Sequence, residues 1–401
     1  MAQYIIIGNG IAANSAAESI RKTDAQGKIL MFTREKYHFY YIPALPEYLA
    51  GEKELNSITI HNDQWYRNNN IDLYLDTEVT GVDPSGKTIT TRNDKKFTYD
   101  KLLIATGGYS FVPPINGTEN EGVFSLRTLD DASRIRQKAA SSRELVLIGG
   151  GLLGLEAGNG LRKSDLKVTV VEFFPRLLPR QMDVSGAAIL QKQMEDMGFT
   201  FLLGAKTSSI TREEDRLSVN LENGENIRTD MVLISAGVRP EITLAKALGL
   251  EIDRGVKVDD LMRTGIEDIY AAGDLIEHRG RFYGIWPASM EQGKIAGANM
   301  AGKEEQYNGT VLANTLKVVG IDLTAAGDID ADGKLESIIT ENQGEGIYRK
   351  LVIKDNIIEG TILLGDIRGS EEILNAIKTK RDISSVKTDI LKEDFDFSLL
   401  K

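Results

Sequence analysis

The stretch that decides the fold runs from Leu145 to Glu172. It reads Leu145-Val146-Leu147-Ile148, then Gly149-Gly150-Gly151-Leu152-Leu153-Gly154, and ends in Val168-Thr169-Val170-Val171-Glu172. An apolar run, a G-x-G-x-x-G turn that opens a helix, and a second apolar run ending in an acid are typical of a Rossmann βαβ unit. Gly149 permits the tight turn, Gly151 lets the backbone approach a pyrophosphate, and Gly154 lets helix and strand pack closely. Residues 149–154, the second fingerprint, therefore predict a dinucleotide site.

The acid at the end of this unit predicts which nucleotide binds. Glu172 follows Gly154 by 18 residues and is placed to accept a hydrogen bond from a ribose 2′-OH. The same carboxylate would repel a 2′-phosphate. The sequence therefore favours NADH over NADPH.

Length and charge limit the class of protein. With 401 residues, the chain is expected to form two or three domains. The net charge of -11 argues against a nucleic-acid surface. No apolar run approaches the roughly 18 residues of a membrane span. A strand begins almost at once, at Tyr4, with no signal-peptide pattern before it, so we expect a cytoplasmic protein.

The chain has no cysteine, and this limits its chemistry. Disulfides, thiolate nucleophiles, cysteine-held zinc and protein-held iron–sulfur clusters are all excluded. The three histidines, His38, His61 and His278, are too scattered to predict a metal site, and we expect none. If the chain carries out redox chemistry, that chemistry must therefore belong to a bound organic cofactor.

A similar motif opens the chain. The buried strand from Tyr4 to Ile7 is followed by Gly8-Asn9-Gly10-Ile11-Ala12-Ala13, the first fingerprint, with alanine at the permitted third position. The next strand ends in Thr33-Arg34-Glu35. Glu35 is the nearest carboxylate for a ribose, but a solvated loop charge is an equally good interpretation.

Three later stretches point to the same kind of site. The aromatic stretch 37–49 would either line a planar ring system or form a packed aromatic loop. A buried strand ends in Ala105-Thr106-Gly107, and Ala236-Gly237-Val238 echoes it, which suggests an internal duplication. The strand ending in Gly273-Asp274 places a carboxylate where ribityl hydroxyls can donate to it.

The rest of the chain reads as a helix over 286–300 and a small α+β domain from about residue 304. Residues 328–333 begin like a calcium loop, but Ile339 stands where the bidentate glutamate is required, so a turn between strands is predicted. The apolar side chains of the tail, 387–401, would dock on a partner or fold back on this domain.

The order of these motifs resembles the pyridine nucleotide–disulfide oxidoreductase superfamily, which carries FAD on the first fingerprint and NAD on the second. Leu316-Lys317-Val318-Val319-Gly320-Ile321, followed by a short α+β domain, resembles the NADH:rubredoxin oxidoreductase branch and the flavin module of assimilatory nitrite reductases. The resemblance implies an α/β fold with two Rossmann-like nucleotide-binding domains, the second inserted into the first, plus a small C-terminal α+β domain. The implied bounds are 1–110 and 240–303 for FAD, 111–239 for NAD, and 304–401 for the C-terminal domain and tail.

The resemblance also implies the site residues. For FAD they are Gly8, Asn9, Gly10, Ile11, Ala12, Ala13, Arg34, Glu35, Pro43, Val79, Ala105, Thr106, Gly107, Arg127, Gly273, Asp274, Trp286 and Lys317. For NAD they are Gly149, Gly151, Leu152, Leu153, Gly154, Glu172 and Gly237. Glu156 would order the nicotinamide end, although compensation of the helix dipole also explains an acid there. The redox cysteine of some relatives is matched by Pro43, so disulfide and peroxide chemistry is not expected.

The implied reaction passes a hydride from NADH to FAD and then electrons to an external acceptor. One hypothesis is a rubredoxin-like iron protein, for which the basic run 378–381 is a candidate docking surface. A second is that the chain is the flavin subunit of a larger iron–sulfur assembly. A third, from a different class, is a flavin-bearing redox sensor with little turnover.

Overall fold

The computed structural model describes residues 1–311 and 313–400, with the side chains of 314–318 outside that description. The chain divides into two compact units, each formed from three segments. The first unit contains Met1–Ile42, Glu54–Ser110 and Val238–Thr310. The second contains Pro43–Lys53, Phe111–Gly237 and Val311–Lys401.

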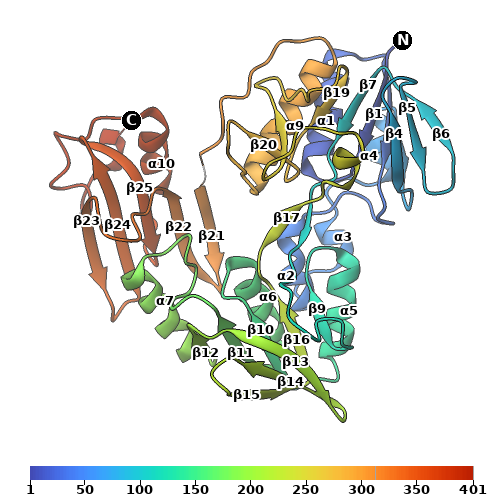
Figure 1. The fold of residues 1–401 in the computed structure, drawn as a ribbon. Helices are drawn as coiled ribbons and strands as arrows, with labels where there is room; N and C mark the ends of the chain where they lie inside the picture. Colours follow the sequence, from blue (N-terminus) through green and yellow to red (C-terminus); the bar gives the residue numbers. More distant parts are fainter. Residues whose placement is uncertain (312, 401) are drawn as a thin grey trace. The chain divides into compact units, whose positions relative to one another are not determined.

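The first unit is built on a five-stranded parallel sheet (Figure 1). Its central strands are nearly continuous apolar runs, as expected of strands covered on both faces. Ile5 and Ile6 of the central strand are fully buried. The order across the sheet is β19 (Ile269–Ala271), β7 (Lys101–Ile104), β1 (Gln3–Ile7), β2 (Lys28–Phe32) and β3 (Ile71–Tyr74).

Two helices distant in sequence pack together in this unit. Figure 1 shows α9 (Trp286–Met300), in orange, beside the blue α1 (Ile11–Thr23). Glycines make the close approach possible, because a Cβ at Gly293 would lie 2.2 Å from the Ala12 carbonyl oxygen. A Cβ at Gly297 would lie 2.3 Å from the Ala16 carbonyl oxygen. The helix predicted at 286–300 therefore lies along the helix that the first fingerprint opens.

The remaining elements of the first unit are short. A three-stranded antiparallel sheet contains β4 (Val79–Asp83), β5 (Thr88–Thr91) and β6 (Lys96–Thr98). Two-stranded pairs join β8 (Gly108–Ser110) to β17 (Val238–Pro240) and β18 (Val256–Val258) to β20 (Ile276–His278). The short helices are α3 (Leu55–Ile58), α4 (Asp63–Asn68) and α8 (Thr243–Ala247), and the 3-10 turn η1 (Ile42–Ala44) joins the units in sequence.

The second unit contains a similar parallel sheet. Its order is β12 (Thr200–Leu203), β11 (Lys167–Glu172), β10 (Glu144–Ile148), β16 (Met231–Ile234) and β9 (Val123–Ser125). Its helices are α2 (Leu45–Leu49), α5 (Leu129–Ala139), α6 (Leu152–Lys163) and α7 (Val184–Asp196). An antiparallel meander follows, of β13 (Thr207–Glu213), β14 (Arg216–Leu221) and β15 (Asn226–Thr229). The two parallel sheets differ at one edge, where β9 precedes the central strand in sequence and β19 follows it.

The C-terminal segment adds an antiparallel sheet to the second unit. Its order is β21 (Ala313–Val318), β22 (Ile321–Gly327), β25 (Ile357–Leu364), β24 (Ile347–Lys354) and β23 (Glu336–Asn342). The helix α10 (Ser370–Thr379) and the 3-10 turn η2 (Phe397–Leu400) follow. The calcium-like stretch lies between β22 and β23, which are not neighbours, so it is a connection between strands as predicted but not a hairpin turn.

The tail folds back on this sheet, which decides between the two alternatives left by the sequence. Ile390, Leu391 and Leu400 are buried. They belong to one apolar cluster with Leu351 of β24 and Ile373 of α10. These side chains are therefore part of a core and do not form an apolar surface for a partner.

A buried polar cluster joins this sheet to α7. Asp183 caps α7 by accepting from Gly186 N–H at 3.0 Å. The other carboxylate oxygen accepts from the Tyr348 hydroxyl at 2.6 Å and from Lys350 Nζ at 3.1 Å. Lys350 Nζ also donates to the Asp330 carbonyl oxygen at 3.0 Å. The buried lysine of β24 is thus both paired and hydrogen-bonded, as a buried charge requires.

Candidate nucleotide-binding sites

The first fingerprint forms the turn between β1 and α1. Gly8 has φ +126°, and a Cβ there would lie 2.1 Å from the Ala105 carbonyl oxygen, so only glycine fits. Gly10 is different: its φ is -82°, and a Cβ there would meet nothing within 4 Å. No neighbouring group among the described residues requires a glycine at this position. The open space above Gly10 fits a ligand group that must approach the backbone closely, such as a diphosphate at a helix N-terminus.

Gly273 and Asp274 lie beside this turn. A Cβ at Gly273 would be 3.0 Å from the Ala12 Cβ. Helix α9 fixes both residues, because Gly273 N–H donates to Gln292 Oε1 at 3.0 Å and Ser289 Oγ donates to Asp274 Oδ1 at 3.0 Å. Sequence reasoning did not assign roles to Gln292 and Ser289. Their place in a small-residue helix shortly after Gly273-Asp274 was the available signal.

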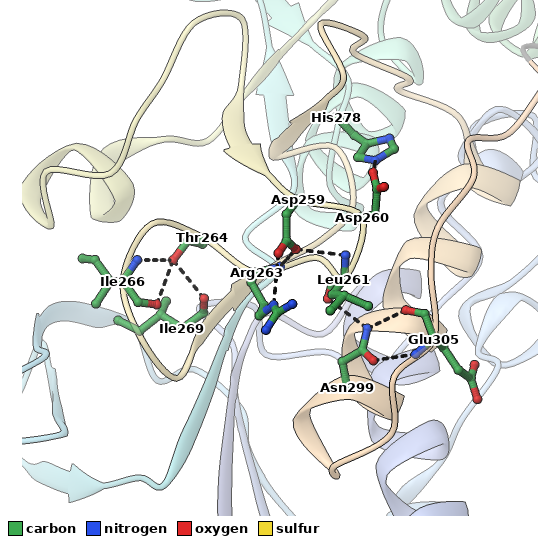
Figure 2. Close-up of polar contacts among 10 residues, drawn as sticks. All are labelled: Asp259, Asp260, Leu261, Arg263, Thr264, Ile266, Ile269, His278, Asn299 and Glu305. Atoms are coloured by element: carbon green, nitrogen blue, oxygen red, sulfur yellow. Dashed lines mark hydrogen bonds and ion pairs between the residues drawn. The ribbon is translucent and has the colours of Figure 1, made fainter.

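Figure 2 shows how the loop before β19 is held. Asp259 Oδ1 accepts from the backbone N–H groups of Leu261 and Arg263, both at 2.9 Å. Asn299, near the end of α9, donates to the Leu261 carbonyl oxygen at 3.0 Å and to that of Glu305 at 2.8 Å. The loop that delivers Gly273-Asp274 is therefore tied to the same helix that packs on α1.

The residues predicted near the FAD ribose have protein partners. Glu35 Oε2 accepts from the Tyr40 hydroxyl at 2.8 Å. Arg34 lies 3.8 Å from Glu241, and Thr106 Oγ1 donates to the Glu241 carbonyl oxygen at 2.9 Å. The bond from Tyr40 fixes the Glu35 carboxylate just after the end of β2, and its contact with a ribose stays a prediction.

The aromatic loop is partly packed and partly exposed. Phe39 is buried and stacks on Trp286 with ring centroids 5.9 Å apart. Tyr41 meets the same indole edge to face at 5.0 Å and keeps 42% of its surface exposed. Phe39 therefore belongs to a packed loop, and Tyr41 and Trp286 keep surface that a planar ring could cover.

The other residues implied for FAD fall in different places. Val79 is a buried core residue at the start of β4. Pro43, Arg127 and Lys317 belong to the second unit, and the Lys317 side chain lies outside the described residues. Within the first unit the structure groups Gly8 and Gly10 with Ala105 and Gly273-Asp274.

The second fingerprint repeats the design of the first between β10 and α6. Gly149 has φ +108°, and a Cβ there would lie 2.3 Å from the Ser235 carbonyl oxygen. A Cβ at Gly154 would lie 2.8 Å from the Ser235 Cβ, which is the close helix–strand packing expected of that glycine. Gly151 has φ -81°, and a Cβ there would meet nothing within 4 Å. The protein again leaves open space above the middle glycine, which fits a diphosphate.

Glu172 braces this turn with both carboxylate oxygens. It is buried, and Oε2 accepts from Gly150 N–H at 2.5 Å. Oε1 accepts from Phe174 N–H at 2.8 Å. A carboxylate has about four acceptor positions, so these two bonds leave acceptor positions that a ribose hydroxyl could use. Leu153, Phe173 and Phe174 are exposed around the same turn, and Gly237 follows β16 with φ +105°.

Glu156 has a partner that the sequence did not predict. Its Oε1 accepts from the backbone N–H of Val319 at 2.6 Å. Val319 and Gly320 form the tip of the β21–β22 hairpin, and both have positive φ. Burial raises the pKa of Glu156, and the bond from Val319 opposes that shift. In this structure the carboxylate therefore binds the hairpin tip of the C-terminal sheet.

Among residues 1–311 and 313–400, no three or more metal-ligating side chains lie together. Within the same residues, every helix is too short or too polar to pass through a bilayer.

Comparison with known proteins decides the family. Residues 2–303 match the family described as "Pyridine nucleotide-disulphide oxidoreductase". The chain belongs to this family. Residues 313–381 match a second family, "Rubredoxin NAD+ reductase C-terminal domain". The predicted superfamily and fold class are both confirmed, and so is membership of an FAD- and NAD(H)-binding oxidoreductase family.

Two curated relatives of this chain have different names and lengths. A "Nitrite reductase [NAD(P)H]" of Bacillus subtilis is 35% identical over 386 residues, covering 95% of this chain and 48% of the relative. An "NADH-rubredoxin oxidoreductase" of Clostridium acetobutylicum is 30% identical over 389 residues, covering 96% and 97%. The chain thus spans about half the length of the first of these relatives and nearly all of the second.

A solved structure shows the same fold. The crystal structure of NADH:rubredoxin oxidoreductase from Clostridium acetobutylicum superimposes with a TM-score of 0.81 at 27% identity, covering 99% of both chains. The chain therefore shares the fold of this family member.

Proposed function

We propose that this protein is an FAD-dependent NADH oxidoreductase that passes electrons to a small rubredoxin-like iron protein. The observation that carries the proposal is the pair of fingerprints, each with open space above its middle glycine, Gly10 in one unit and Gly151 in the other. Family membership and the matching C-terminal segment support it.

The fingerprints suit the two nucleotides in different ways. Gly8 to Ala13, with Gly273 and Asp274, would hold FAD. Gly149 to Gly154 would hold NADH, with Glu172 accepting from its ribose and opposing a 2′-phosphate. FAD, when bound, supplies the conversion between two-electron hydride chemistry and one-electron transfer. With no cysteine in the chain, the protein's own residues bind and orient the nucleotides and supply no redox centre.

The division of labour along the chain is part of the proposal. We propose residues 1–110 and 240–303 as the FAD domain, 111–239 as the NAD domain, and 304–401 as the C-terminal domain. Glu156 would order the nicotinamide end of NADH, which requires its carboxylate to leave Val319 N–H or to share that bond. Its raised pKa, caused by burial, fits a carboxyl that exchanges hydrogen-bond partners.

A second candidate function differs from the first in the electron acceptor. The chain spans 48% of the Bacillus subtilis nitrite reductase, so it also fits the flavin module of a larger enzyme. In that case the iron centres would lie on another chain or segment, because this one offers no cysteine ligands. The match of residues 313–381 to the family "Rubredoxin NAD+ reductase C-terminal domain" favours a separate rubredoxin-like acceptor protein.

Anaerobic stopped-flow spectroscopy tests the proposal. The purified protein, with its flavin, is mixed with NADH or NADPH, and oxidised rubredoxin is then added in excess. Fast bleaching of the flavin by NADH, followed by rapid reoxidation on adding rubredoxin, supports it. Bleaching without reoxidation would assign the electrons to another partner, such as the remainder of a larger enzyme. Slow bleaching would favour a sensor, and faster reduction by NADPH would contradict the role given to Glu172.

A further inference from the structure

A buried polar cluster lies behind the first fingerprint and is not used by the proposed reaction. It consists of Asn14, His61 and Tyr66, and it joins α1, the loop before α4 and α4 to the partly exposed Asn9 of the fingerprint. Asn14 is 1% exposed, Tyr66 3% and His61 9%. These three side chains are too buried to form the surface on which a nucleotide lies. Their hydrogen bonds therefore stabilise the protein around the site.

Asn14 is the centre of the cluster. Its Nδ2 lies 3.0 Å from the Asn9 carbonyl oxygen, 3.0 Å from the Gly10 carbonyl oxygen and 3.0 Å from Asn9 Oδ1. Its Oδ1 accepts from the Tyr66 hydroxyl at 2.9 Å and lies 3.1 Å from His61 Nδ1. Every polar atom of this side chain is thus committed to the fingerprint or to its support.

Tyr66 ties a third segment to the same point. Its hydroxyl lies 2.9 Å from Asn9 Oδ1 as well as from Asn14 Oδ1. The Phe39 backbone, in the aromatic loop, lies close to this hydroxyl group. One phenol group therefore links the fingerprint, the first turns of α1 and the loop that carries Tyr41.

The geometry of the peptide bond gives these contacts a consequence. In a trans peptide, the C=O of one residue and the N–H of the next point in opposite directions. Holding the Asn9 and Gly10 carbonyl oxygens on Asn14 therefore turns the N–H groups of Gly10 and Ile11 to the opposite side. Those N–H groups stand at the start of α1, where a helix has unpaired donors suited to an anion.

The second fingerprint provides an internal comparison. Counting from the first glycine, its equivalent of Asn14 is Leu155, which is fully buried and apolar. Its equivalent of Asn9 is Gly150, which has no side chain and is held through its N–H by Glu172. Among the residues described there, no side-chain amide holds the carbonyl groups of the second turn; the Gly150 carbonyl oxygen accepts instead from the backbone N–H of Leu178 at 3.1 Å.

We propose that Asn14 and Tyr66 are positioning residues that pre-order the amide groups of the first fingerprint, so that this site retains FAD while the second exchanges its nucleotide. Pre-ordering removes part of the entropy cost of binding, which lowers the dissociation constant without a new contact to the ligand. The inference rests on the proposed function, because it requires FAD at the first fingerprint.

Two variants and a matched control test the proposal. Asn14→Leu copies the residue of the second fingerprint, and Tyr66→Phe removes only a hydroxyl. Tyr99→Phe is the control, because Tyr99 is 3% exposed in the same core and its hydroxyl has no hydrogen-bond partner within the part of the chain that the structure describes. Apoprotein is titrated with FAD by fluorescence quenching, the second site is titrated with NAD+, and thermal unfolding of each apoprotein is measured.

We expect Asn14→Leu to weaken FAD binding about ten- to a hundred-fold and Tyr66→Phe about tenfold, from the loss of one to three buried hydrogen bonds. The double variant should lose less than the product of the two effects, because both act through one cluster. The NAD+ dissociation constant should be unchanged in every variant, and the FAD dissociation constant of Tyr99→Phe should equal that of the wild type.

The outcomes separate this inference from the proposed function. If wild-type apoprotein does not bind FAD, the proposed function fails first. If the wild type binds FAD and Tyr66→Phe and Asn14→Leu bind it equally well, the positioning role is overturned and the proposed function stands. A loss of FAD affinity matched by equal losses in NAD+ affinity and in apoprotein unfolding temperature would show a general structural role and would also overturn it.

Discussion

Replacing Gly151 with alanine tests whether this glycine is needed to bind the nucleotide or to stabilise the fold. The backbone of Gly151 has φ -81° and ψ 164°, which alanine adopts freely, and the new Cβ would meet nothing within 4 Å. Alanine restricts the unfolded chain and stabilises by about 0.4–1 kcal/mol, but it is a poorer N-cap than glycine by a similar amount. These effects oppose each other, so the free energy of unfolding should change by less than about 1 kcal/mol.

The effect on binding should be much larger. If the diphosphate of NADH lies over Gly151, the added methyl group occupies its space, and overpacking of this kind costs about 1–3 kcal/mol. That corresponds to a dissociation constant raised about 5- to 150-fold. The assay is a calorimetric titration of the oxidised protein with NAD+, together with chemical unfolding of the same preparation.

Gly154→Ala is the matched control, three residues further on. There the new Cβ would lie 2.8 Å from the Ser235 Cβ and 2.9 Å from its Oγ. This variant should lower the free energy of unfolding by about 1–3 kcal/mol. An unchanged NAD+ dissociation constant in a stable Gly151→Ala protein would refute the reasoning, because the space above Gly151 would then not hold the diphosphate.

Three further predictions follow from single contacts. Lys350→Met leaves the buried Asp183 carboxylate without its cation and should lower the free energy of unfolding by about 3–5 kcal/mol; in chemical unfolding, Lys192→Met, at an exposed pair with Asp196, should change little. Burial lowers the pKa of His61 from 6.5 to about 4, so the unfolded state binds the extra proton first. Stability should therefore fall by about 3 kcal/mol as pH drops from 6.5 to 4, and His61→Gln should remove this pH dependence; an unchanged slope would show that His61 does not cause it. Glu172→Gln should reduce the preference for NADH over NADPH in kcat/KM by about tenfold, and an unaltered ratio would mean that another group excludes the 2′-phosphate.

The sequence by itself determined the two nucleotide-binding units and their chemistry. Local patterns were sufficient, because a G-x-G-x-x-G turn between an apolar strand and a helix has few other structures available to it. The absence of cysteine needed only a count, and it restricted the redox chemistry to bound cofactors. The strand ending in Gly273-Asp274 was recognisable for the same local reason.

Only the tertiary structure decided which side chains support these sites. Asn14 meets Tyr66 and His61 across 52 and 47 residues of sequence, and Glu156 meets Val319 across 163. The sequence of the tail left two alternatives, because apolar residues can bind a partner or pack into a core. Ile390 and Leu400 are buried in the core of the C-terminal sheet, which decides for the second. The physical reason is the same for Asn14, Glu156 and the tail. The type of a residue indicates whether its side chain must be buried or hydrogen-bonded, but the fold of the whole chain determines which partner it contacts.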